Sequence, residues 1–146
     1  MSYTNWDGRL LALAQHIGRW SKDPSTQVGA VITDPQRRIV SVGYNGFPAG
    51  VEDRFEWLND RETKYALTIH AETNAILFAS RDISDCTLYT WPFMPCRRCA
   101  TLVIQKGITR VVAPVTPDDL QERWGVELKA SYDLLRHSGV NVDLLL

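Results

Sequence analysis

The chain has 146 residues, a length that predicts a single domain over residues 1–146. Hydrophobic residues make up 45% and charged residues 23%, which excludes disorder as the main state. A formal net charge of −1 gives no general electrostatic reason to bind nucleic acid or a membrane surface. No apolar run approaches the ~20 residues of a membrane span, and the N-terminus lacks a secretion signal, so we expect a cytoplasmic protein.

The three cysteines indicate metal binding or redox chemistry in preference to disulfides. Their odd number cannot form a closed disulfide framework, which favours a reducing compartment. Cys96 and Cys99 form a C-x-x-C pair, whereas Cys86 lies in an apolar segment and is expected to be a core residue.

A helix is predicted near the start of the chain. Apolar side chains between Leu10 and Trp20 recur at the spacing of one helix face. Thr4, Asn5 or Asp7 can cap the first turn, because a short polar side chain accepts hydrogen bonds from the free backbone N–H groups there.

Two strands and a long irregular segment follow. Residues 28–33 and 39–44 have strand composition, and the turn chemistry of residues 34–37 joins them as a hairpin. Residues 45–69 predict no regular element. Because compact domains rarely keep such a segment without a use, we expect it to serve the function.

Helices and strands alternate in the second half of the chain. Helices are predicted over residues 71–80 and 96–106 and from Asp118 or Asp119 to about 138, and strands over residues 86–89, 110–113 and 140–145. Crossovers of helical length imply parallel strand pairing. Together with the hairpin, this order predicts an α/β domain with three α/β/α layers and a mixed five-stranded sheet.

Two short motifs carry the chemistry, and each lies at a predicted helix start: His70-Ala71-Glu72 and Pro95-Cys96-Arg97-Arg98-Cys99. Cys96 and Cys99 are three positions apart, so they share a helix face, and the helix N-terminus favours their thiolates. His70 completes a set of three ligands that suits zinc. Three protein ligands leave the fourth position open, which is the pattern of a catalytic zinc site.

Glu72 is the candidate proton carrier of this site. If His70 lies in the cap region before the helix, both side chains can converge, and Glu72 can exchange protons with a zinc-bound water and the substrate. Each motif alone has a simpler explanation. An isolated H-A-E triplet is common by chance, and an isolated C-x-x-C pair also serves structural zinc or redox chemistry.

Four stretches resemble the cytidine-deaminase superfamily, namely residues 21–30, 43–50, 70–76 and 95–100. The last two contain the H-x-E…P-C-x-x-C signature of zinc deaminases. The first two, together with residues 63–65, resemble the deoxycytidylate (dCMP) deaminases in particular. This resemblance implies a cytidine-deaminase-like fold and the zinc-dependent hydrolysis of dCMP to dUMP and ammonia, which supplies dUMP for thymidylate synthesis.

The resemblance also implies roles for individual residues. His70, Cys96 and Cys99 hold zinc, and Glu72 carries protons to N3 of the cytosine and to the leaving amino group. The remaining contacts are expected at four positions: the carbonyl of Ala71 accepts from that amino group, Asn45 binds the deoxyribose hydroxyl, and Ser21 and Lys22 are candidates for the 5′-phosphate. A solvated helix end is the alternative interpretation of Ser21 and Lys22.

The same resemblance implies regulation by nucleotides. The dCMP deaminases that the chain resembles are activated by dCTP and inhibited by dTTP, with Mg²⁺ at the triphosphate, and they are often hexamers. The expected effector residues are Gly43, Tyr44, Gly46, Phe47 and Pro48. Glycines allow backbone amides to approach phosphates closely, although a turn-rich connector would have the same composition.

One departure from the resemblance concerns residues 89–95, a segment one residue longer than the usual loop before the cysteines. Trp91, Phe93 and Met94 are expected to line or support the base pocket.

Two alternative functions remain. One is deamination of a nucleoside or of a tRNA adenosine, and the other is a non-catalytic zinc or nucleotide-binding domain. The absence of a basic stripe favours the nucleotide over RNA.

Overall fold

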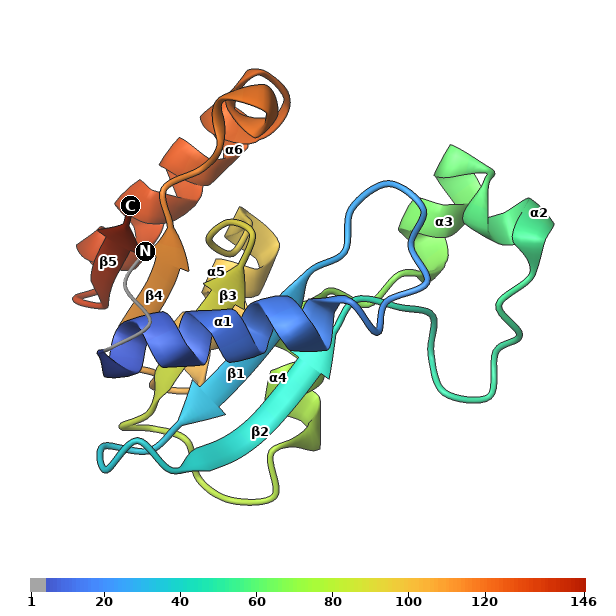
Figure 1. The fold of residues 1–146 in the computed structure, drawn as a ribbon. Coiled ribbons are helices and arrows are strands. Elements are labelled where there is room, and N and C mark those ends of the chain that lie inside the picture. Colours follow the sequence, from blue (N-terminus) through green and yellow to red (C-terminus); the bar gives the residue numbers. More distant parts are fainter. Residues whose placement is uncertain (1–4) are drawn as a thin grey trace.

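The computed structural model describes residues 5–146 of the chain. Its helices and strands follow in the order α1 (Trp6–Gly18), β1 (Gly29–Thr33), β2 (Ile39–Tyr44), α2 (Phe55–Leu58), α3 (Arg61–Leu67), α4 (Ala71–Phe78), β3 (Thr87–Trp91), α5 (Arg97–Gln105), β4 (Arg110–Pro114), α6 (Asp118–His137) and β5 (Asn141–Leu145). Figure 1 shows the α2–α3 segment projecting from the main body of the molecule. None of these helices combines the length and apolar character that a membrane crossing demands.

The strands of residues 5–146 form one mixed five-stranded sheet with the order β2-β1-β3-β4-β5. Strand β1 runs antiparallel to both β2 and β3, whereas β3, β4 and β5 are parallel to one another. The hairpin of β1 and β2 and the parallel pairing in the second half are therefore confirmed. Helix-length crossovers through α5 and α6 produce this parallel half, as the chain order requires.

Helices cover both faces of the sheet, so the predicted three layers are confirmed (Figure 1). On one face, Leu11 and Ala14 of α1 pack with Val31 and Tyr89. The larger cluster on the other face joins strand residues to apolar side chains of α4, α5 and α6, among them Ala75, Val103, Leu128 and Leu135. This second face matters for function, because α4 and α5 both begin at its edge, near the carboxyl end of β3.

Helix α1 agrees with the expected position except at its C-terminal end. Asn5 is the N-cap, and its side-chain oxygen accepts from the backbone N–H of Gly8 at 2.6 Å. The alternative cap Thr4 lies outside the described residues. Trp20, expected on the apolar helix face, instead follows the end of α1 and is 53% exposed, so that expectation is wrong. The helix ends before it could turn Trp20 toward the sheet.

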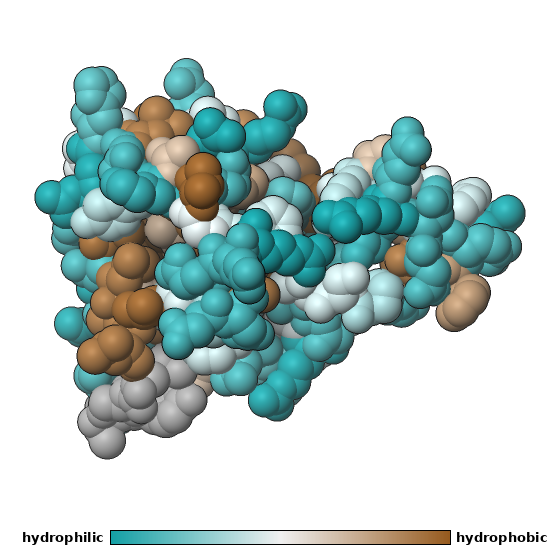
Figure 2. Space-filling view, turned by 90° about the horizontal axis from the view of Figure 1, so that it is seen from above, coloured by the Kyte–Doolittle hydropathy of each residue, from teal (hydrophilic) through white to brown (hydrophobic). Residues whose placement is uncertain are grey.

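The expectation of an irregular segment over residues 45–69 is also wrong, because this segment contains α2 and α3. Asp60 caps α3 by accepting from the N–H of Thr63 at 3.4 Å. An isolated bridge between Gly46 and Ile69 closes the excursion at its base. Both helices are short and bury almost nothing except Lys64, so they lack the apolar periodicity that identifies a helix in sequence. Hydrophilic side chains dominate this projecting part when the molecule is seen from above (Figure 2).

Candidate functional site

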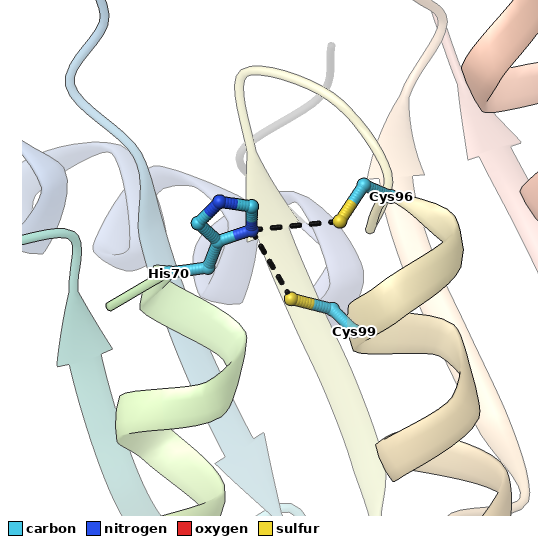
Figure 3. Close-up of side chains that lie close together, drawn as sticks. All are labelled: His70, Cys96 and Cys99. Atoms are coloured by element: carbon cyan, nitrogen blue, oxygen red, sulfur yellow. Dashed lines mark hydrogen bonds between the residues drawn. The ribbon is translucent and has the colours of Figure 1, made fainter. Parts of the chain in front are cut away.

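The three expected ligand residues meet where two helices begin. His70 is the N-cap of α4, and Cys96 is the N-cap of α5. Cys99 lies in the first turn of α5, so its side chain shares a helix face with Cys96. The prediction that both motifs lie at helix starts is confirmed. In Figure 3 the His70 ring, from α4, faces the two sulfur atoms across the gap between the helices.

The distances between these donor atoms suit a zinc ion. Nδ1 of His70 lies 3.4 Å from each Sγ of Cys96 and Cys99, and all three donor atoms lie within 4.8 Å of one another. Zinc ligands at about 2.3 Å for sulfur and about 2.0 Å for nitrogen, arranged tetrahedrally, stand roughly 3.5 Å apart. The group therefore fits a single zinc ion held by three ligands.

The charges of the site prepare it for a cation. Hydrogen bonds with Cys99 and His70 lower the pKa of the Cys96 thiol, which favours its thiolate form. The hydrogen bond to Cys96, together with burial, raises the pKa of Cys99. His70 also has a raised pKa, mainly because of its hydrogen bond with Cys96. The sulfurs thus share negative charge that a divalent cation would neutralise.

Glu72 is buried beside these ligands with one oxygen unpaired. Its residue is 4% exposed, and its Oε1 has no hydrogen-bond partner in the described chain. Burial raises the pKa of this carboxyl, partly opposed by the charge of His70. A buried polar atom without a partner needs an explanation, and a water or ligand at the site supplies one. A raised pKa also suits a group that must both accept and release protons.

A cavity of about 480 Å³ opens onto this group. The expected residues His70, Ala71, Glu72, Cys96 and Asn45 all line it. Its other walls come from the loop before β1, from α3 and from α6, so segments distant in sequence enclose one space. The volume falls in the usual range for small-molecule sites.

Several supporting residues were missed by the sequence reasoning. The Thr73 hydroxyl lies 3.5 Å from Sγ of Cys99. On α6, the Ser131 hydroxyl donates to the carbonyl of Pro95 at 2.6 Å, and Glu127 accepts from the N–H and the guanidinium of Arg97. The contacts of Ser131 and Glu127 hold residues 95–97, next to Cys96, against α6. Contacts of this kind, one step removed from the metal, orient the metal ligands. Thr73 lies within a stretch that resembles the family, so that resemblance was a signal for it. Glu127 and Ser131 lie on α6, which carries no motif, so the sequence offered no signal for them.

Asn45 is buried in the cavity wall, and most of its hydrogen-bonding capacity is used. Its Oδ1 accepts from the N–H of Val28 at 2.9 Å, and its Nδ2 donates to the carbonyl of Thr26 at 2.9 Å. A second lone pair of Oδ1 remains available to a ligand hydroxyl. The side chain thus holds the loop before β1 while facing the cavity.

The two phosphate candidates lie elsewhere. The Ser21 hydroxyl is buried and donates to the carbonyl of Asn45 at 2.8 Å. The Lys22 ammonium pairs with Asp53 at 3.0 Å and is largely exposed. Neither residue lines the cavity described above.

Of the expected effector residues, Gly43 has a clear packing role. A Cβ at Gly43 would meet the carbonyl of Ala71 and would lie 2.5 Å from the nitrogen of Ala75. Gly43 therefore allows α4 to lie directly on β2. At Gly46 a Cβ would meet nothing within 4 Å, and Tyr44 packs edge-on against Trp20. Phe47 and Pro48 are half-buried in the turn that follows.

We expect Gly43→Ala to destabilise the fold by about 1–3 kcal/mol, because the new methyl group must displace backbone atoms of α4. Urea unfolding of the variant measures this loss. Gly46→Ala is the matched control and should change the free energy of unfolding by less than about 0.5 kcal/mol. Equal stabilities of the two variants would contradict the packing role.

The aromatic segment before the cysteines divides between the two faces of the sheet. Phe93 lines the cavity and packs against Trp124 of α6, with ring centroids 6.1 Å apart. Met94 is buried in the core cluster below, and Trp91 packs on the α1 face. Only Phe93 of the three expected residues therefore reaches the cavity wall.

Comparisons with known proteins agree with this site. The family model of the cytidine and deoxycytidylate deaminase zinc-binding region matches residues 4–115. A protein of Aliivibrio fischeri described as an uncharacterized deaminase is 48% identical over 142 residues, which cover 97% of this chain and 95% of that protein. The human deoxycytidylate deaminase is 41% identical over 116 residues, which cover 75% of this chain.

The fold has a solved counterpart in a dCMP deaminase from the cyanophage S-TIM5, crystallised with dCMP and dUMP. The TM-score is 0.71 at 21% identity, and the match covers 92% of this chain and 93% of the phage enzyme. The match with the human enzyme covers only 65% of that enzyme, so the rest of the human protein lies outside the aligned region.

Proposed function

The chain belongs to the cytidine and deoxycytidylate deaminase family, and from this we propose that it is a dCMP deaminase, which hydrolyses dCMP to dUMP and ammonia. One observation carries the proposal, namely the unpaired Glu72 oxygen buried beside the His70, Cys96 and Cys99 donor atoms, in a cavity that Glu72, His70 and Cys96 line. A purely structural zinc site has no need of this carboxylate. Relatives described as deoxycytidylate deaminases support the substrate.

His70, Cys96 and Cys99 would hold the zinc ion through Nδ1 and the two sulfur atoms. When bound, zinc lowers the pKa of a water and so makes it a nucleophile at neutral pH. The helix N-termini at His70 and Cys96 favour negative charge in the same place.

Glu72 moves the protons in the proposed reaction. Its carboxylate takes a proton from the attacking water, passes it to N3 of the cytosine, and later assists the departure of the amino group as ammonia. The Ala71 carbonyl accepts from that amino group and so orients C4 of the base. Asn45 accepts from the deoxyribose hydroxyl through its Oδ1.

The test is deamination of dCMP, cytidine and a tRNA adenosine by the zinc-loaded protein under identical conditions. We expect dCMP to have the highest kcat/KM of the three. A higher value for cytidine or for tRNA would favour the alternative of another superfamily substrate. No turnover of any of them by protein that contains zinc would favour the non-catalytic alternative.

The proposal extends to regulation and context. We propose that residues 1–146 act as a single domain in a cytoplasmic homohexamer that supplies dUMP for thymidylate synthesis. dCTP with Mg²⁺ is the proposed activator and dTTP the inhibitor, acting at Gly43, Tyr44, Gly46, Phe47 and Pro48. Support comes from the resemblance of this segment and from its continuity with Asn45 in the cavity wall.

Initial rates with and without each effector and Mg²⁺, alongside light scattering, test this part. An unchanged rate with both effectors would contradict the regulation, and a scattering mass below that of a hexamer would contradict the assembly.

A further inference from the structure

A second, smaller cavity of about 340 Å³ adjoins the first. The two share four lining residues, namely Ser25, Lys64, Tyr65 and Arg123, so they adjoin along one wall, with His70 and Cys96 lining the first cavity and Arg61 the second. Among the described residues that line the smaller cavity, three are basic and none is acidic. This charge stands out in a chain with a formal net charge of −1, and it favours an anion.

Arg123 is the basic residue best placed to meet a ligand. It comes from α6, donates from Nη2 to the Tyr65 hydroxyl at 3.3 Å, and lies over the ring of Trp124 at 5.2 Å. In the part of the chain that the structure describes, no carboxylate lies within ion-pair distance of it. Lys64 differs, because its ammonium is buried and already pairs with Asp23 at 3.0 Å.

Tyr65 brings a second basic residue to the same place. The Arg61 guanidinium lies over the Tyr65 ring at 5.3 Å, so both Arg61 and Arg123 lie close to this phenol. Partial burial raises the pKa of Tyr65, but the hydrogen bond from Arg123 and the two guanidinium charges outweigh it, and the pKa lies below its ordinary value. The field around this hydroxyl is therefore positive.

We propose that Arg123, with Tyr65 beside it, binds the 5′-phosphate of the substrate and makes the site selective for a nucleotide over a nucleoside. The inference rests on the proposed function, which places the base at the metal ligands. A nucleotide with its base there would direct its phosphate toward the wall that the two cavities share, where Lys64 and Arg123 lie. The planar guanidinium offers paired donors that match phosphate oxygens, and Arg123 has no carboxylate to release first.

The sequence-based candidates for the phosphate are the rival assignment. The Ser21 hydroxyl is engaged by the Asn45 carbonyl, and the Lys22 ammonium by Asp53. Neither residue lines either cavity. The structure therefore favours Arg123 over Lys22 as the cation that meets the phosphate.

The test compares Arg123→Gln with wild type on dCMP and on deoxycytidine. We expect kcat/KM for dCMP to fall about 10- to 100-fold, mainly through KM, while kcat/KM for deoxycytidine changes less than about twofold. Arg136→Gln is the matched control, because Arg136 also lies on α6 over an aromatic ring, that of Tyr132, but lines neither cavity. It should leave both values unchanged.

Three results would overturn the assignment. These are an equal loss on both substrates, an unchanged kcat/KM for dCMP, or a selective loss of dCMP turnover in Lys22→Gln in place of Arg123→Gln. Calorimetric binding of dUMP and deoxyuridine separates this inference from the proposed function. If no cytosine compound is turned over but dUMP binding still depends on Arg123, the proposed function fails and the phosphate site stands.

Discussion

Glu72→Gln is expected to reduce kcat for dCMP by about 10³-fold or more while the zinc content stays at the wild-type level. The amide keeps the shape of the side chain but cannot accept and release a proton, and positioned proton transfer contributes about 10²–10⁴-fold to such reactions. Steady-state kinetics and metal analysis of the same preparation measure both quantities. We also expect the melting temperature of the metal-free variant to equal or exceed that of the wild type, because the buried carboxyl is costly to ionise.

Glu62→Gln provides the control for this variant. Glu62 is an exposed residue of α3 that does not line the cavity, so its replacement should leave kcat unchanged. Activity retained by Glu72→Gln would refute the proton-carrying role. A loss of zinc would mean that Glu72 serves the metal ligands in place of the substrate.

Cys99→Ala is expected to abolish both zinc binding and turnover. Two ligands remain in this variant, and removing a direct ligand should weaken zinc binding by more than the 10- to 100-fold that loss of an outer contact costs. Zinc stoichiometry after dialysis and dCMP turnover measure the effect. In the wild type, removal of zinc by a chelator should have the same consequence, and added zinc should restore the activity.

Cys86→Ala is the matched control, because Cys86 is the other fully buried thiol and lies in the core, away from the site. It should keep its zinc and its activity and lose only about 1 kcal/mol of stability from the missing sulfur. Zinc retained by Cys99→Ala, or zinc lost by Cys86→Ala, would show that the ligand assignment is wrong.

The regular part of the fold could be predicted because its signals are local. Apolar periodicity identified α1, α4 and α5, start and stop residues identified α6, and strand composition with crossover length led to the mixed sheet. The α2–α3 segment escaped prediction since short, exposed helices bury too little apolar surface to leave a pattern. Trp20 was misplaced because periodicity continues past the residue where the helix actually ends.

The proposed substrate contacts were less predictable than the candidate metal ligands. Ser21 and Lys22 have the chemistry of a phosphate site, but their side chains are occupied by Asn45 and Asp53, which lie more than 20 positions away. Arg123 carries no motif, and only the tertiary fold brings it from α6 to the cavity and to Tyr65 of α3. Contacts between distant segments decide which polar groups are free to bind a ligand.

The sequence by itself determined the chemistry of the candidate metal site. The spacing of Cys96 and Cys99, each near a helix start, follows from local geometry, and so does the place of His70 one residue before α4. What only the tertiary structure decided is the enclosure around that chemistry. The packing of α4 and α5 on one face of the sheet sets the 3.4 Å separations, and α3 and α6 close the cavity and make its outer end basic. Such convergence depends on long-range burial of apolar surface, which no short motif encodes.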